Sequence, residues 1–153
     1  MIVTISQATL DALHTHARDC YPDECCGMIV ERSGREEAVR VTNIQNERHA
    51  QDPEQFPRTA ATAYQMGPEH VPILIAAERG ELVLRAFYHS HPDHDAYFSA
   101  EDRKQAMGGW DEPNYPAAGQ IVISVRERVV RATKAFAWNE AARDFVETAL
   151  VVR

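Results

Sequence analysis

Two histidines and an aspartate stand close together in one short stretch, at a spacing that suits a metal site. His89 and His91 lie two residues apart at the end of the strongest strand signal, so their imidazoles point to the same side. We expect Pro92, directly after them, to end the sheet. Imidazole is the commonest metal ligand in proteins, and zinc binds its nitrogens readily. Asp102, in the first turn of the next predicted helix, offers a third, oxygen ligand.

Three protein ligands would leave the fourth tetrahedral position of a zinc ion to water, as in catalytic rather than structural sites. Each residue also has an ordinary interpretation. A bare His-x-His arises easily by chance in a chain with seven histidines. Ser99 followed by Asp102 is typical of a capping box at a helix start, and His94 fits a solvated loop residue better than a ligand. Finding His-x-His-Pro and Ser-x-x-Asp in one short stretch is much rarer, and this combination favours the metal site.

The same residues resemble the signature of a known family. His-Ser-His-Pro at 89–92, followed by Ser-Ala-Glu-Asp at 99–102, is similar to the pattern of the JAMM metallopeptidases, also called MPN-plus or Mov34-type domains. That pattern includes an upstream glutamate in a segment resembling Pro-x-Glu-x-Cys-Gly, after the first helix. Pro-Asp-Glu-Cys-Cys-Gly stands there, at 22–27. The resemblance extends over residues 2–138 and every motif position matches.

The resemblance implies a role for each motif residue. His89, His91 and Asp102 correspond to zinc ligands. Glu24 corresponds to the general base that orients and deprotonates the attacking water, although taken alone it fits a solvated acid before a turn. Ser99 corresponds to the hydroxyl that stabilises the tetrahedral oxyanion. The implied cofactor is Zn²⁺, and the implied fold is an α/β sandwich in which helices flank a mixed β-sheet, similar to cytidine deaminases.

The activity that the resemblance implies is zinc-dependent hydrolysis of peptide or isopeptide bonds after the C-terminal Gly-Gly of a ubiquitin-like or sulfur-carrier protein. The compact chain looks like the small prokaryotic members of the family. Two alternatives stay open: a non-catalytic MPN-type scaffold, and a purely structural zinc site with His94 or a cysteine as fourth ligand. The loop 108–119 either walls a substrate groove through Trp110 and Tyr115 or is an ordinary surface loop.

Composition narrows the class further. With 153 residues we expect a single domain over 1–153, and with 16 basic against 23 acidic residues a net charge of −7, which argues against binding nucleic acid. The most apolar stretch, 71–77, is far shorter than the ~20 residues of a membrane span, and residues 1–7 lack a secretory leader, so we expect a cytoplasmic protein. Cys25 and Cys26 are expected to be small buried hydrophobes; thiolate ligation of zinc fits the open site less well.

Apolar periodicity predicts the elements that position the motif. Ser6 is expected to cap a helix that ends before Pro22, and residues 45–63 read as a surface loop with a brief strand after it at 64–66. The order of elements suggests one mixed sheet. Strands are expected over 2–5, 27–31, 39–44, 82–88, 121–125, 129–138 and 145–152, and further helices over 69–79 and 99–107.

Overall fold

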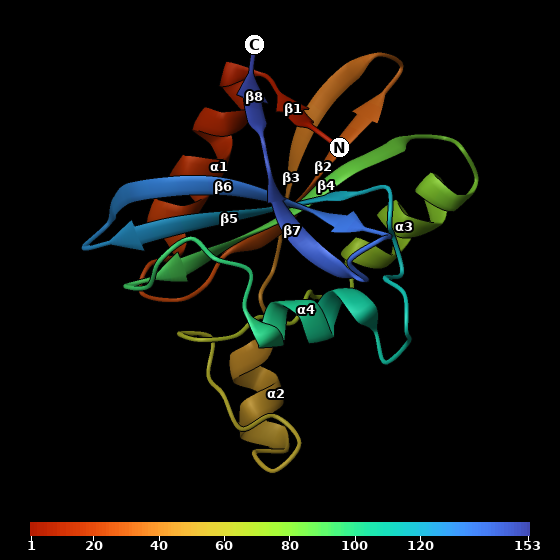
Figure 1. Cartoon of the computed structure of the whole chain (residues 1–153). Coiled ribbons are helices and arrows are strands. Elements are labelled where there is room, and N and C mark those ends of the chain that lie inside the picture. Colours follow the sequence, from red (N-terminus) through yellow and green to blue (C-terminus); the bar gives the residue numbers. More distant parts are fainter.

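A mixed six-stranded sheet forms the centre of the protein, for which a computed structural model describes all 153 residues (Figure 1). Its strand order is β3-β2-β4-β5-β6-β7, and only β4 and β5 pair in parallel. Strands β1 and β8 form a separate parallel pair. The strands are β1 (Val3–Ile5), β2 (Cys26–Arg32), β3 (Arg35–Val41), β4 (Val83–Pro92), β5 (Gly119–Arg126), β6 (Val129–Asn139), β7 (Asp144–Thr148) and β8 (Leu150–Val152).

Helices lie on both faces of this sheet, which confirms the predicted α/β class. On one face, Leu13 and Ala17 of α1 pack in a buried cluster with Ile121 and Ile123 of β5. The alternate residue of β5, Val122, points to the other face, where α3 and α4 lie. The helices are α1 (Gln7–Cys20), α2 (Gln45–Gln51), α3 (His70–Glu78) and α4 (Ala100–Met107). No helix is both long and apolar enough to cross a membrane.

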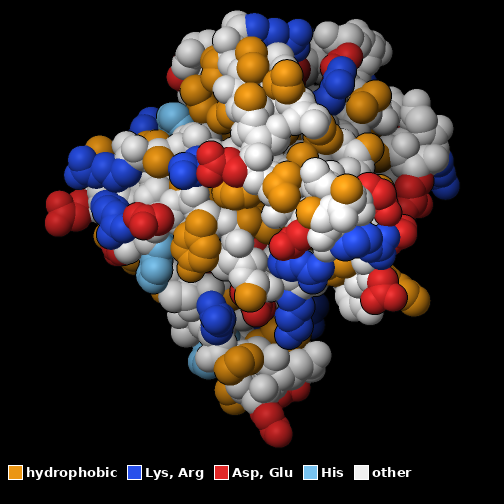
Figure 2. Space-filling view, viewed as in Figure 1, with side chains coloured by type: hydrophobic (Ala, Val, Ile, Leu, Met, Phe, Trp, Pro, Cys, Tyr) orange, Lys and Arg blue, Asp and Glu red, His pale blue; other side chains and the backbone are white.

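Acidic and basic side chains are intermixed on the face of the molecule seen in Figure 2. A nucleic-acid binder would instead present a continuous basic stripe. This face therefore gives no support to phosphate binding, in keeping with the net charge of −7. The cytoplasmic location expected from the sequence stays a prediction.

The predicted loop over residues 45–63 is wrong in its first part, because residues 45–51 form α2. This helix projects from the body of the molecule at the base of Figure 1. Of its residues only Gln45 is buried, so it has no apolar stripe from which a helix could be predicted. The side chain of Asn43 accepts a hydrogen bond from the backbone N–H of Gln45 at 3.0 Å, which satisfies one of the free donors at the helix start.

Three strand predictions also need correction. The hairpin partner expected over 39–44 instead occupies 35–41, because Ser33 and Gly34 adopt positive φ values of 53° and 75° in a tight turn that pairs Arg35 with Arg32. The strand expected over 145–152 is split between two sheets, as β7 and β8. The brief strand at 64–66 is reduced to a single bridge between Asn43 and Met66.

Strand β4 extends past the predicted bounds of 82–88 and ends at Pro92, which pairs with Val125 of β5, so the expectation that this proline ends the strand is confirmed. The proline has no N–H, but its carbonyl side still permits pairing in register. The chain turns away at the next residue, Asp93, which has a positive φ of 60°. Both motif histidines therefore sit on a paired strand rather than on a loop, and this holds their backbone rigidly.

Candidate metal centre

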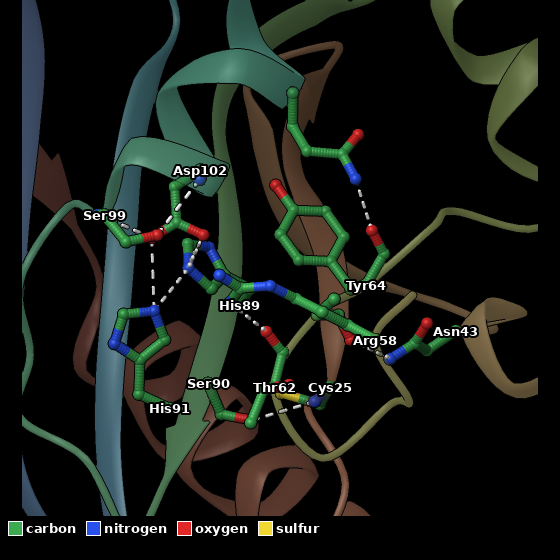
Figure 3. A network of polar contacts seen from close by, with 12 residues as sticks. Cys25, Asn43, Arg58, Thr62, Tyr64, His89, Ser90, His91, Ser99 and Asp102 are labelled. Atoms are coloured by element: carbon green, nitrogen blue, oxygen red, sulfur yellow. Dashed lines mark hydrogen bonds and ion pairs between the residues drawn. The ribbon is translucent and has the colours of Figure 1, made fainter. Parts of the chain in front are cut away.

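The site lies where the start of β2, the end of β4 and the first turn of α4 meet (Figure 3). Cys26 pairs with His89 across the antiparallel strands. One residue further out, Cys25 and Ser90 hold each other twice: the Cys25 N–H donates to Ser90 Oγ at 2.8 Å, and the Ser90 N–H donates to the Cys25 carbonyl at 3.1 Å. This double contact fixes the residue before Cys25, Glu24, beside the two histidines.

The start of α4 holds Asp102 in place through the predicted capping box. Asp102 N–H donates to Ser99 Oγ at 3.1 Å, and Ser99 N–H donates to Asp102 Oδ2 at 2.9 Å. The ordinary interpretation of this Ser-x-x-Asp pair is therefore present in the structure. The same geometry points the carboxylate of Asp102 at both imidazoles, so capping and metal ligation do not exclude one another.

Three motif side chains meet at close range. His89 Nε2 and His91 Nε2 are 3.1 Å apart, and they lie 3.0 Å and 3.2 Å from the two carboxylate oxygens of Asp102. Ligand atoms on a tetrahedral zinc ion, at ~2.0–2.1 Å from the metal, are separated by about 3.3 Å. Glu24 completes the group, in which one ligand atom from each of the four residues lies within 4.8 Å of the others.

The chemistry of these buried groups fits a divalent metal such as zinc. Each of the four residues is at most 6% exposed. His91 Nδ1 lies 2.8 Å from the carbonyl of Asp95, which directs Nε2 into the group, as backbone carbonyls commonly do for metal-binding histidines. Glu24 Oε1 is buried without any hydrogen-bond partner. A buried carboxylate oxygen without a partner is costly, and a bound cation or its water would satisfy it.

The two carboxylates of the site are perturbed in opposite directions. Burial, and next the negative charge of Asp102, raise the pKa of Glu24 to about 9. Burial alone would also raise the pKa of Asp102, but the adjacent imidazoles of His89 and His91 outweigh it and lower that pKa well below its usual range. One acid is thus poised to hold a proton and the other to stay ionised, which is the pattern of paired catalytic carboxylates.

A polar cavity of about 80 Å³ opens beside this group. It suits a polar backbone, because Tyr97 and Pro92 are its only lining residues with a largely apolar side chain, and its size leaves little room for a large side chain. His94 lines it but does not belong to the metal-ligand group; its Nδ1 lies 2.8 Å from the carbonyl of Pro92. The lining residues are Glu24, Arg58, Thr62, His91, Pro92, His94, Tyr97, Ser99 and Asp102.

Sequence reasoning missed the segment that covers the site. The Ala60 carbonyl accepts a hydrogen bond from Glu24 N–H at 2.8 Å, and Asn43 Nδ2 donates to the Glu24 carbonyl at 2.9 Å. Arg58 points toward the group in Figure 3, and its positive charge opposes the rise in the pKa of Glu24. The ring of Tyr64 stacks on His89 with 4.8 Å between centroids. These residues follow no motif, because each acts through a contact distant in sequence.

The cysteines beside Glu24 take no part in the metal-ligand group. Cys25 packs in the buried cluster on the α1 face of the sheet, and Cys26 in the cluster on the α3 face. Burial raises the pKa of the Cys25 thiol to about 12 and raises that of Cys26 as well, so both stay neutral thiols near pH 7. The expectation that they are small buried hydrophobes is confirmed, and neither His94 nor a cysteine supplies a fourth ligand.

Fold and site together define an α/β domain with a candidate metal centre at the ends of two neighbouring strands. Residues 6–142 match the family described as prokaryotic homologs of the JAB domain, and the chain belongs to this family. The resemblance to the JAMM/MPN-plus family, as a small prokaryotic member, is thereby confirmed. A comparison with curated proteins gave no match.

Solved structures show the same fold. The solution structure of protein DSY2949 from Desulfitobacterium hafniense has a TM-score of 0.68 at 21% identity, covering 100% of this chain and 93% of that one. A protein from Salinibacter ruber has a TM-score of 0.61 at 24% identity, covering 98% and 90%. AF2198, a JAB1/MPN domain protein from Archaeoglobus fulgidus, has a TM-score of 0.51 at 15% identity, covering 97% and 98%.

Proposed function

We propose that this protein is a zinc-dependent hydrolase of peptide or isopeptide bonds. The observation that carries the proposal is the convergence of Glu24, His89, His91 and Asp102, from three separate segments, into one buried group. A non-catalytic scaffold would gain stability by replacing the unpartnered carboxylate of Glu24 with an apolar residue. Keeping that acid beside two imidazoles and a second carboxylate makes sense for catalysis.

His89, His91 and Asp102 would hold the zinc ion, which when bound supplies a Lewis acid and makes water a nucleophile near neutral pH. Without a cation Glu24 is neutral near pH 7, because burial raises its pKa to about 9; a cation bound beside it would favour the ionised form, whose unpartnered Oε1 would take the proton of the attacking water and pass it to the leaving amine. Its backbone, held by Ala60, Asn43 and the Cys25–Ser90 pair, keeps that oxygen in position.

Ser99 serves the same reaction from the other wall of the cavity. Its Oγ accepts a hydrogen bond from Asp102 N–H, and no acceptor within the protein takes its hydroxyl proton. That proton is free to point into the cavity and stabilise an oxyanion. The helix cap thereby orients the hydroxyl as a donor.

We infer that the substrate is the C-terminal tail of a ubiquitin-like or sulfur-carrier protein, cut after Gly-Gly. A cavity of about 80 Å³ admits backbone but few side chains, and glycine brings the backbone closest to the reacting groups. A compact domain cannot enter, whereas a flexible tail can. The net charge of −7 favours fast association with a neutral or basic carrier, and salt should weaken this effect.

The experiment that tests this function is mass spectrometry of carrier fusions incubated with the zinc-loaded enzyme. We expect a single cut after Gly-Gly, abolished by a chelator and by Glu24→Gln. Cleavage at unrelated sequences with the Gly-Gly tails left intact would refute the substrate, and no cleavage of any fusion would refute the hydrolase. If the chelated protein loses its far-ultraviolet circular dichroism, the metal is structural instead.

A further inference from the structure

A second cavity, of about 190 Å³, adjoins the metal centre, with Tyr64 between the two. Tyr64 stacks on His89 and also lines this second cavity. Phe87, two residues before His89 on β4, lies on the same face of the sheet and lines it as well. Gln105, one helical turn beyond Asp102 on α4, forms part of its wall. A chain bound at the metal centre therefore passes close to this cavity.

None of the residues that line this second cavity is Asp, Glu, Lys or Arg, in a chain that is 25% charged, and His70 is the only imidazole among them. The rings of Phe87 and Tyr115 face each other at a tilt, with 5.7 Å between centroids. Leu74 and Pro113 add apolar surface. Glu78 lies beside Tyr115 but outside the lining, so the lining itself gives a charged group no ion-pair partner and favours an uncharged ligand with a flat apolar body.

Two largely buried residues on the walls carry polar groups that have no hydrogen-bond partner within the chain. Gln120 of β5 is 4% exposed, and its side-chain amide makes no hydrogen bond within the chain. Tyr64 is 8% exposed, and its hydroxyl makes none either. Neither group is among the polar atoms that are shut off from solvent, so a ligand that brings a donor and an acceptor would replace water there and be selected for those two groups. The amide and the hydroxyl together offer both.

We propose that this second cavity is a binding pocket for an uncharged aromatic side chain with a polar tip, of the tyrosine type, carried by the polypeptide that the metal centre cuts. The link to the cut polypeptide rests on the proposed function. Residues two apart on a strand are separated by about 6–7 Å, which is the span from His89 to Phe87. An extended substrate therefore presents this side chain about two residues after the scissile bond, since the two residues before it are the Gly-Gly of the proposed function.

Nuclear magnetic resonance titration of the full-length protein tests the pocket directly. N-acetyl-tyrosinamide should shift the side-chain amide signal of Gln120 and bind roughly five- to tenfold more tightly than N-acetyl-phenylalaninamide, which lacks the hydroxyl. N-acetyl-lysinamide should not bind there. Gln120→Leu should remove the preference for tyrosine over phenylalanine, and an apolar residue in this wall preserves the fold. Gln55→Leu, the same change on an exposed loop, should leave the preference intact.

The proposed binding pocket is refuted if no compound shifts the Gln120 signal, or if N-acetyl-lysinamide binds as tightly as N-acetyl-tyrosinamide. Cleavage of peptides with Gly-Gly before the scissile bond and Tyr or Ala two residues after it then tests the link to catalysis. We expect a higher kcat/KM with Tyr than with Ala, and we expect Gln120→Leu to remove this difference. Binding without any such preference overturns the link. Since the titration needs neither metal nor turnover, absence of all cleavage would refute only the proposed function.

Discussion

Replacing Glu24 by glutamine should stabilise the metal-free protein while it abolishes turnover. Burial and the charge of Asp102 raise the pKa of Glu24 from 4.5 to about 9, so the folded protein holds a proton that the unfolded chain releases above pH 4.5. Because the pKa of Glu24 is raised by folding, this group contributes its full stabilisation below pH 4.5. That contribution to the free energy of unfolding is lost as the pH rises toward 9. Glutamine, which resembles the neutral acid in shape, avoids this loss.

The size of the effect follows from the shift. Each pH unit above 4.5 costs the wild-type protein about 1.4 kcal/mol, so the difference from Glu24→Gln reaches about 3 kcal/mol at pH 7. Asp102 and the histidines are common to both proteins and largely cancel in the comparison. The expected result is near-equal stability at pH 4.5 and a growing advantage of Glu24→Gln toward pH 8.

The assay is urea unfolding of both chelated proteins at a series of pH values, together with kcat of the zinc-loaded forms. The matched control is Glu54→Gln, the same change at an exposed glutamate without hydrogen bonds or ion pairs, which should alter neither quantity. Loss of the general base should lower kcat by ~10²–10⁴-fold. A stability difference that does not vary with pH would refute the raised pKa, and wild-type turnover would refute Glu24 as the base.

Three further substitutions test other parts of the site. His91→Ala should lose the bound metal and the activity together, so full metal occupancy by elemental analysis would contradict its assignment as a ligand. Ser99→Ala should lower stability by ~1 kcal/mol through the lost cap, and kcat by ~10²-fold or more through the lost donor; an unchanged kcat would leave only the cap. Ser90→Ala leaves the buried Cys25 N–H without its acceptor and should lower the free energy of unfolding by about 1–3 kcal/mol, as measured in urea.

Local periodicity explains why most of the candidate site could be predicted from the sequence. His89 and His91 share a face because strands repeat every two residues, and Ser99 with Asp102 marks a helix start in almost any context. A role for Glu24 could be predicted only through the family resemblance, because its neighbours in the sequence do not distinguish it from a solvated acid. The same local signals predicted one mixed sheet with helices beside it.

The parts that could not be predicted depend on contacts between distant segments. Helix α2 has no apolar face, and Asn43 anchors it while also holding the Glu24 backbone, at a separation of 19 residues. The stacking of Tyr64 on His89 and the neutral pocket around Gln120 arise only when the loop after α2 folds over the sheet. No spacing rule connects a lone tyrosine or glutamine to such a place.

Asp102 shows why the ordinary and the catalytic interpretations of one motif need not compete. Its Oδ2 accepts the Ser99 N–H at 2.9 Å and lies 3.2 Å from His91 Nε2, while its Oδ1 lies 3.0 Å from His89 Nε2. The cap removes the rotational freedom that a free aspartate would have to lose on binding a metal. A helix cap thus preorganises a ligand, and the serine that completes the cap keeps its own hydroxyl proton for the cavity. The helix start and the candidate metal centre therefore share Asp102, and Ser99 lies beside both.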